Sequence, residues 1–234
     1  WGIHWGDGTS DTVAGDPSST THKYADNGFY IITATYVDSD GVVHQANNTV
    51  RVEILNVAPT LTPRGRSTAF EGSPYNLVLR STDPGADAIR QWIVSWGDGQ
   101  SSVVAGNLNR ALHTYADNGV YTIRLGASDE DGSYVSPNTL RVTVANVAPA
   151  LSVLGDAAVD EGSPYTVNLG AADPGADTID HWTINWGDGH VETIPGSPAS
   201  VSHTYANGAN TYTIQASATD EDGSYAAAPL SVLV

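Results

Sequence analysis

Aspartate residues recur in two short loop patterns whose residue types could bind a cation. Asp-Pro-Gly-Ala-Asp occupies residues 83–87 and 173–177, and Asp-x-Asp-Gly occupies residues 38–41, 129–132 and 220–223. Carboxylate oxygens are ligands that Ca²⁺ prefers, and this ion takes about 6–8 oxygen ligands at ~2.3–2.6 Å. The spacing of an EF-hand does not follow the Asp-x-Asp-Gly pattern. A calcium site would therefore have to be assembled by the fold from several loops.

These acidic patterns belong to a longer repeat. The segment Trp-x-x-x-Trp-Gly-Asp-Gly begins at Trp1, Trp92 and Trp182, and each acidic pattern returns after 90 or 91 residues. A fixed period is the signature of a chain built from repeated folded units. We therefore predict three domains. They are residues 1–55, which hold the C-terminal part of a domain, and the domains 56–145 and 146–234.

Each repeat has the pattern of short β-strands. Within residues 91–96, Trp92, Val94 and Trp96 share one face, and the residues between them share the other. This alternation is typical of a strand with one buried side. Gly-Asp-Gly and Asp-Gly turns separate the strands. The pattern predicts an all-β fold of tandem immunoglobulin-like β-sandwiches, of about seven strands each, arranged end to end.

Such a sandwich would gather the acidic loops at one pole. The loop between its second and third strands, its last hairpin loop and the incoming linker all lie at that pole. Like charges crowded together repel one another unless a cation is bound. The alternative interpretation is that Asp-Pro and Asp-Gly only make turns. The candidate calcium ligands are Asn56, Asp83, Asp87, Asp129 and Asp131, and, one repeat later, Asn146, Asp173, Asp177, Asp220 and Asp222.

Other recurring residues are better explained by structure than by chemistry. Asp98 and its copies suit Asx turns between glycines. Trp92 and Trp96 fall on the inward face, where core packing is a better explanation than a sugar-binding platform. His113 has no second His or Cys at ligand spacing, so we expect a hydrogen bond at a strand end rather than a metal site. No hydrolase or phosphate-binding motif is present, and we therefore expect no enzyme.

Composition excludes several classes of protein. The chain has 26 Asp and Glu against 9 Lys and Arg, a formal charge of −17, which would repel a nucleic acid. No apolar stretch approaches the ~20 residues that cross a bilayer, so we expect no membrane insertion. Cysteine is absent, which excludes disulfides and thiolate sites. Methionine is absent too, which indicates a processed product or an interior piece of a longer protein.

Three motifs together resemble a known domain family. They are Trp-x-x-x-Trp-Gly-Asp-Gly, His-Thr-Tyr-Ala-Asp-Asn-Gly-x-Tyr-Thr-Ile from His113, and Asp-x-Asp-Gly. They resemble the polycystic-kidney-disease (PKD) domain of bacterial and archaeal extracellular type, whose usual centre is Trp-Asp-Phe-Gly-Asp-Gly. Trp96 stands where the family commonly has Phe, and the third copy has one extra residue between His203 and Tyr212. The resemblance implies tandem extracellular modules without catalysis, with calcium near domain junctions in some members.

These observations lead to one main expectation and one alternative. The main expectation is a non-enzymatic structural or adhesive module of a secreted or surface protein. It would form a stiff stalk or extracellular fibre with other copies of the repeat or chain, stabilised by calcium at its domain junctions, with surface proteins or glycans as further partners. The alternative is an accessory glycan-binding module of a secreted multidomain hydrolase. An exposed aromatic strip would favour the alternative, and Tyr134 and Tyr225 are its candidate residues.

The first repeat lacks its opening strands. Trp1 aligns with Trp92, and the repeat that contains Trp92 starts near Asn56, so about 36 residues are missing. We expect Trp1, Ile3 and Trp5 to face water without those strands. Either upstream residues of the same polypeptide or strands donated by another copy of the chain would complete the domain.

Overall fold

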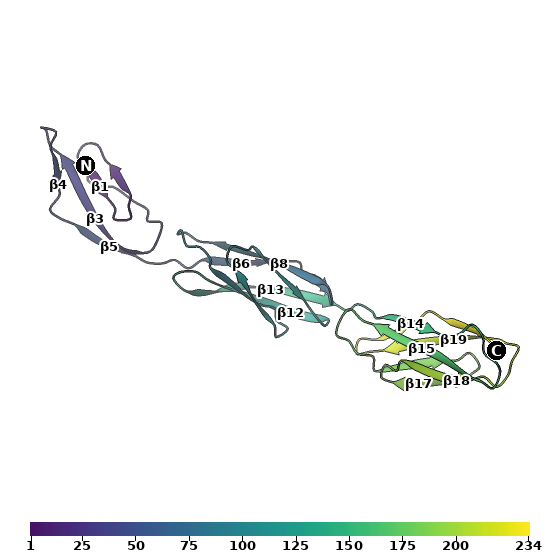
Figure 1. Ribbon diagram of the computed structural model, residues 1–234. Coiled ribbons are helices and arrows are strands. Elements are labelled where there is room, and N and C mark those ends of the chain that lie inside the picture. Colours follow the sequence, from purple (N-terminus) through teal and green to yellow (C-terminus); the bar gives the residue numbers. More distant parts are fainter. The chain divides into compact units, whose positions relative to one another are not determined.

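The computed structural model describes residues 1–234 and consists of strands joined by turns and loops (Figure 1). No helix long and apolar enough to cross a membrane is present. The strands are β1 (Gly2–His4), β2 (Ser10–Thr12), β3 (Gly28–Val37), β4 (Val43–Gln45), β5 (Val50–Ile54), β6 (Thr60–Arg64), β7 (Thr68–Phe70), β8 (Pro74–Thr82), β9 (Gln91–Ser95), β10 (Ser101–Ala105), β11 (Arg110–Thr114), β12 (Gly119–Ser128), β13 (Ser133–Ala145), β14 (Ala150–Leu154), β15 (Pro164–Ala172), β16 (His181–Asn185), β17 (Val191–Pro195), β18 (Ser200–Thr204), β19 (Thr211–Thr219), β20 (Ser224–Ala226) and β21 (Leu230–Leu233).

The chain divides into two compact units. The first comprises Trp1–Gly65, Leu77–Ala111 and Ile123–Leu140, and the second comprises Arg66–Asn76, Leu112–Thr122 and Arg141–Val234. The repeat at 56–145 therefore contributes residues to both units.

The sheets confirm the predicted all-β sandwich class. The second repeat has one sheet in the order β10-β9-β12-β13-β7 and another in the order β11-β8-β6. Seven of these strands match the expected number, and the short strand β7 is added in parallel to β13. The third repeat has the sheets β14-β15-β18 and β17-β16-β19, and its last strand is divided into β20 and β21, which both pair with β19. The first repeat forms one sheet, β2-β1-β3-β4, with β5 also paired to β3.

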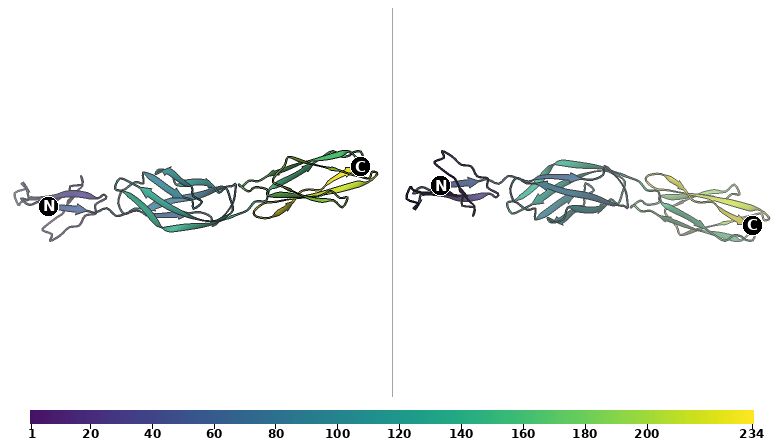
Figure 2. Two further views of the ribbon diagram at one scale, coloured as in Figure 1. Left: turned by 90° about the horizontal axis from the view of Figure 1, so that it is seen from below. Right: turned by 90° about the horizontal axis from the view of Figure 1, so that it is seen from above.

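The alternating pattern places the core as predicted. Trp92, Val94 and Trp96 on β9 are buried, whereas Ile93 between them is 40% exposed. The third repeat repeats the arrangement on β16, and Figure 2 shows its strands, in green to yellow, from two further sides. Its core consists of Val153, Tyr165, Val167, Leu169, Trp182, Ile184, Trp186, Tyr205, Ile214, Ala216, Ala218 and Val232.

The first repeat corrects one expectation. Trp5 does not face water, since only 6% of it is exposed. The His22 ring stacks on the indole with ring centroids 4.6 Å apart, and the indole N–H donates a hydrogen bond of 2.8 Å to Asp11. Trp1 remains 39% exposed, and Ile3 is half-buried. The expectation was wrong for Trp5 because it left out covering groups from within the same repeat.

Candidate metal sites

In the Asp-x-Asp-Gly loops of the second and third repeats, the first aspartate uses one carboxylate oxygen for its turn and leaves the other without a partner, whereas in the first repeat Asp38 Oδ2 pairs with His44 Nε2 at 2.6 Å. Asp129 Oδ1 accepts hydrogen bonds from the backbone N–H groups of Asp131 at 2.9 Å and Gly132 at 3.0 Å. Its Oδ2 atom is buried and has no partner. Asp220 repeats this arrangement in the third repeat. The turn interpretation and the ligand interpretation are therefore compatible, because they concern different atoms of one side chain.

The Asp-Pro-Gly-Ala-Asp loops follow the same rule. Gly85 N–H donates to Asp83 Oδ1, and Gly175 N–H donates to Asp173 Oδ1, both at 2.6 Å. In each case the Oδ2 atom is buried without a partner. Asx turns thus fix the orientation of these carboxylates.

The linker asparagines are held by tyrosines. Asn56 Nδ2 donates to the Tyr134 hydroxyl at 2.7 Å, and its Oδ1 atom is left buried without a partner. Asn146 Nδ2 donates to the Tyr225 hydroxyl at 3.1 Å. Burial raises the pKa of both tyrosines. Both rings are half-buried and their hydroxyls contact the linker asparagines, an arrangement that does not favour an exposed aromatic strip.

The first cluster combines Asn56, Asp83, Asp87, Asp129 and Asp131 with Asp26 of the preceding repeat. Carboxylate oxygens of Asp26, Asp87 and Asp131 lie within 4.8 Å of one another. A cleft of about 140 Å³ is lined by Asp26, Asn56, Asp83 and Asp87, among others. Burial and then the charges of Asp83 and Asp131 raise the pKa of Asp87. This volume exceeds the ~30 Å³ share of one water, so an ion with bound water fits.

The second cluster combines Asn146, Asp173, Asp177, Asp220 and Asp222 with Glu71 and Asp117 of the preceding repeat. Oxygens of Glu71, Asp173 and Asp177 lie within 4.8 Å of one another, as do those of Asp117, Asp177 and Asp222. Neither carboxylate oxygen of Asp177 has a hydrogen-bond partner. Burial, followed by the charges of Glu71 and Asp173, raises the pKa of Asp177 to about 7. The raised pKa shows that the negative charge of Asp177 is not balanced by a positive charge nearby.

Glu71 was not among the ligands expected from the sequence. It is fully buried, and its Oε1 atom accepts a hydrogen bond of 2.5 Å from Val147 N–H. Its Oε2 atom has no partner. A buried carboxylate oxygen without a hydrogen-bond partner costs stability, so Glu71 Oε2 joins the candidate ligand atoms of the second cluster.

Asp26 and Asp117 were also missed. Both lie in the recurring segment Tyr-Ala-Asp-Asn-Gly, which the sequence presents only as a turn. The Asp-Pro-Gly-Ala-Asp loop of the following repeat is hydrogen-bonded to this segment through the backbone. Ala86 N–H donates to Ala25 O, and Ala176 N–H donates to Ala116 O, both at 2.7 Å. Glycine permits this approach, since a Cβ on Gly175 would lie 3.0 Å from Glu71 Cδ and 3.1 Å from Ala116 O. The available signal was the recurrence of an acidic residue in both copies of the turn.

The histidines form structural hydrogen bonds, as expected. His22 Nε2 and Asp7 Oδ2 are 2.7 Å apart, and His203 and Asp188 repeat this distance. The hydrogen bonds from Thr9 and His22 lower the pKa of Asp7 to about 2. Each pair ties the aspartate of a Gly-Asp-Gly turn to the histidine of the His-x-Tyr segment.

Comparison with protein families accounts for most of the chain. A family model described as PKD domain matches residues 56–144 and 146–232. The chain belongs to the PKD domain family. The resemblance seen in the sequence is thereby confirmed.

Two curated relatives contain segments similar to these PKD domains. Polycystin-1 of Homo sapiens is 30% identical over 190 residues, which cover 81% of this chain and 4% of that protein. Chitinase A of Pseudoalteromonas piscicida is 28% identical over 138 residues, which cover 56% of this chain and 17% of that protein. The chain thus spans less than a fifth of either relative.

Among solved structures, a PKD domain of an M14-like peptidase from a Thermoplasmatales archaeon is 30% identical. The match covers 38% of this chain and 98% of that one, with a TM-score of 0.34.

Proposed function

We propose that this chain is a non-enzymatic structural or adhesive segment of a larger secreted or surface protein, and that Ca²⁺ bound in the two clusters stabilises it. The observation that carries the proposal is the set of buried oxygens without hydrogen-bond partners in each cluster. In the first cluster these are Asn56 Oδ1, Asp83 Oδ2, Asp87 Oδ1 and Asp129 Oδ2. In the second they are Glu71 Oε2, Asp173 Oδ2, both carboxylate oxygens of Asp177 and Asp220 Oδ2.

The donor set fits calcium better than other cations. All the donors are oxygens, and they come from loops rather than from one rigid element, which suits the variable geometry of a Ca²⁺ site. Mg²⁺ demands near-ideal octahedral geometry and usually keeps several of its waters. A bound Ca²⁺ would offset the repulsion among carboxylates from two consecutive repeats. The cation would therefore stiffen the chain where one repeat follows another.

Repetition supports a stalk or fibre. The same pole recurs along the sequence, so a longer array of these repeats would carry one cation site between each consecutive pair. Many weak contacts on a stiff array give avidity without a strong single site. The partners would be other copies of the repeat or chain, or molecules of a cell surface.

The similarity to part of chitinase A favours a second candidate function. In that case the chain would be an accessory module of a secreted hydrolase and would bind glycan for an attached catalytic domain. The calcium proposal holds for both functions, because it concerns stability and not the ligand.

Thermal unfolding of the whole chain with calcium and with a chelator tests the proposal. A ligand that binds only the folded state adds about 2.7 kcal/mol to the free energy of unfolding at a hundredfold excess over Kd. Magnesium at the same ionic strength is the control, and we expect it to have a much smaller effect. Identical unfolding curves with calcium and with chelator would contradict the proposal.

A further inference from the structure

Positive charge is unevenly distributed among the repeats. Seven of the nine Lys and Arg lie within residues 56–145, and the third repeat contains neither residue type. Most acidic residues of the second repeat lie at its two ends, away from most of these arginines. Apart from Asp98 and Glu130 they all belong to the two clusters. The sheet faces of this repeat are consequently free to carry positive charge in a strongly acidic chain.

Three arginines gather on the outer face of the sheet β11-β8-β6. On this face, Arg64 of β6 lies opposite Val78 of β8, and Arg80 lies opposite Thr62. Leu79 N–H donates to Asn109 O at 2.9 Å, which places Arg110 on the other side of β8 beside Val78. All three arginines are exposed. We call this surface the arginine face.

No acidic residue balances the arginine face. Strands β6, β8 and β11 contain no Asp or Glu. Among the arginines, an ion pair is formed by Arg90, whose Nε atom lies 3.8 Å from Glu130. The guanidinium groups of Arg64, Arg80 and Arg110 therefore remain available to an external anion.

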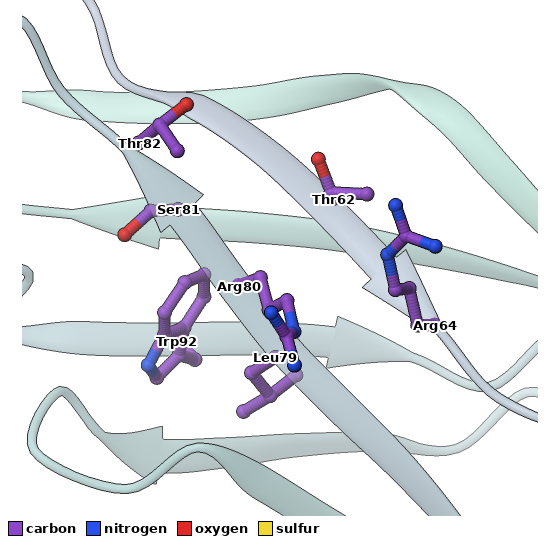
Figure 3. Close-up of a pocket in the computed structure, with 7 residues that line it drawn as sticks. All are labelled: Thr62, Arg64, Leu79, Arg80, Ser81, Thr82 and Trp92. Carbon is purple, nitrogen blue, oxygen red and sulfur yellow. The ribbon is translucent and has the colours of Figure 1, made fainter.

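A cleft adjoins two of these arginines (Figure 3). It has a volume of about 600 Å³, and Arg64 and Arg80 flank it on neighbouring strands. Trp92 is among the lining residues, but only 3% of it is exposed, so it supplies no stacking platform. The other lining side chains are Thr62, Leu79, Ser81 and Thr82. The cleft thus combines the guanidinium groups of two arginines with the neutral hydroxyl groups of Thr62, Ser81 and Thr82.

We propose that the arginine face binds an acidic polysaccharide through its carboxylate or sulfate groups. The arginine fork matches the geometry of these anions, and hydroxyl side chains suit the neutral hydroxyls of a sugar chain. A protein partner fits less well, because interface cores are enriched in aromatic residues and this face exposes none. The inference names a ligand class for the proposed adhesive role and rests on that role, but it does not depend on calcium.

The third repeat provides an internal comparison. Its corresponding sheet β14-β15-β18 has Leu154 where the second repeat has Arg64, and Gly170 where it has Arg80. Ser200 takes the place of Arg110, opposite Asn168. The same backbone surface therefore occurs twice in one chain, once with three arginines and once with none.

Binding of the whole chain to heparin and hyaluronan, with neutral dextran as the control polymer, tests the inference. Heparin presents sulfates and carboxylates, and hyaluronan presents carboxylates alone. The double variant Arg64→Gln/Arg80→Gln should weaken binding to both acidic polymers by about tenfold or more, because each lost arginine removes a charged hydrogen bond. The matched variant Arg124→Gln/Arg141→Gln has the same net charge and should stay within about threefold of wild type.

Several results would overturn the inference. These are equal losses in the two double variants, equal binding of duplex DNA, or no binding of either acidic polymer at low ionic strength. Self-association that disappears in Arg64→Gln/Arg80→Gln would point instead to a second copy of the chain and would also overturn it. Calcium-dependent unfolding of the same samples keeps the two proposals separate. If the wild-type chain binds neither acidic polymer but is still stabilised by calcium, the arginine-face inference fails and the calcium proposal stands.

Discussion

The second and third repeats share a core and differ on their surfaces. Trp96 and Trp186 are both fully buried, and the acidic loops use the same Asx turns in both repeats. Their charges differ strongly, since residues 56–145 carry seven arginines and residues 146–234 carry no Lys or Arg. The comparison teaches that one backbone with one core can present different ligand surfaces. Differences in ligand specificity should therefore be sought at surface positions where the repeats disagree.

The largest expected effect is the loss of stability when a core tryptophan is removed, and it tests whether the cores of the two repeats are equivalent. Trp96→Ala and Trp186→Ala should each lower the free energy of unfolding by about 3–5 kcal/mol, because each removes a fully buried aromatic ring. Urea unfolding followed by circular dichroism measures the loss. Val103→Ala is the control, since Val103 is 68% exposed and should change stability by less than about 0.5 kcal/mol. An unchanged midpoint for either Trp variant would contradict the shared core.

The next prediction concerns a glutamate that both repeats possess. Glu71→Gln should remove most of the calcium-dependent gain of the second cluster, which amounts to about 2.7 kcal/mol at a hundredfold excess of calcium. The matched control is Glu161→Gln, one repeat later, where Oε2 accepts a hydrogen bond from Gly208 N–H at 2.7 Å. Calorimetric melting with and without calcium should separate these two variants. Equal behaviour would show that Glu71 holds no cation.

The effect of pH on the calcium-free chain has a definite sign. The pKa of Asp177 is raised to about 7 in the folded chain and lies near 3.8 without the fold. The folded state therefore binds more protons between these values, and stability should fall as pH rises from about 4 to about 7. Thermal unfolding in chelator across this range measures the trend. Asp177→Asn should flatten it, and a stability that rises with pH in wild type but not in this variant would contradict the assignment.

The smallest expected effect compares the two linker asparagines. Tyr134→Phe and Tyr225→Phe each remove the hydroxyl that holds an asparagine amide, at a cost of about 0.5–1.5 kcal/mol. The Asn56–Tyr134 bond is 2.7 Å long and the Asn146–Tyr225 bond is 3.1 Å long, so Tyr134→Phe should cost more. Calcium affinity should fall in both variants, because the asparagine oxygen loses its fixed orientation. Titration calorimetry measures this affinity. An unaltered calcium affinity in both variants would exclude these asparagines as ligands.

Much of the fold could be predicted because its signals are local. The alternation at Trp92 and Trp96 and the Gly-Asp-Gly turns depend only on neighbouring residues, and repetition in the chain adds weight to each of them. Trp5 was misplaced because its cover comes from His22, which lies in a loop outside the strands, so no local pattern places its ring on the indole. Strand β7 was missed because its three residues carry no alternation.

The candidate sites were predictable only in part. Five residues could be proposed in each of two repeats from the loops and linker, and the structure directs buried oxygens of several of them into the clusters. Glu71 escaped notice because its neighbours Asp173 and Asp177 lie about a hundred positions further along the chain. Nothing local distinguishes a glutamate before a Gly-Ser-Pro turn from a solvent-exposed one. Prediction failed where the site depends on contact between consecutive repeats.

The division of each aspartate between a turn and a free oxygen also bears on how the protein is degraded. If the clusters hold calcium as proposed, the backbone hydrogen bonds to one oxygen of Asp129 and of Asp220 hinder these carboxylates from rotating away from their acidic neighbours when calcium is withdrawn. The repulsion then has to be relieved by opening the loops themselves, while the tryptophan core stays closed. Proteases that attack opened loops would cut there first. Calcium concentration in the surroundings would thus set the lifetime of the chain, independently of the stability of its core.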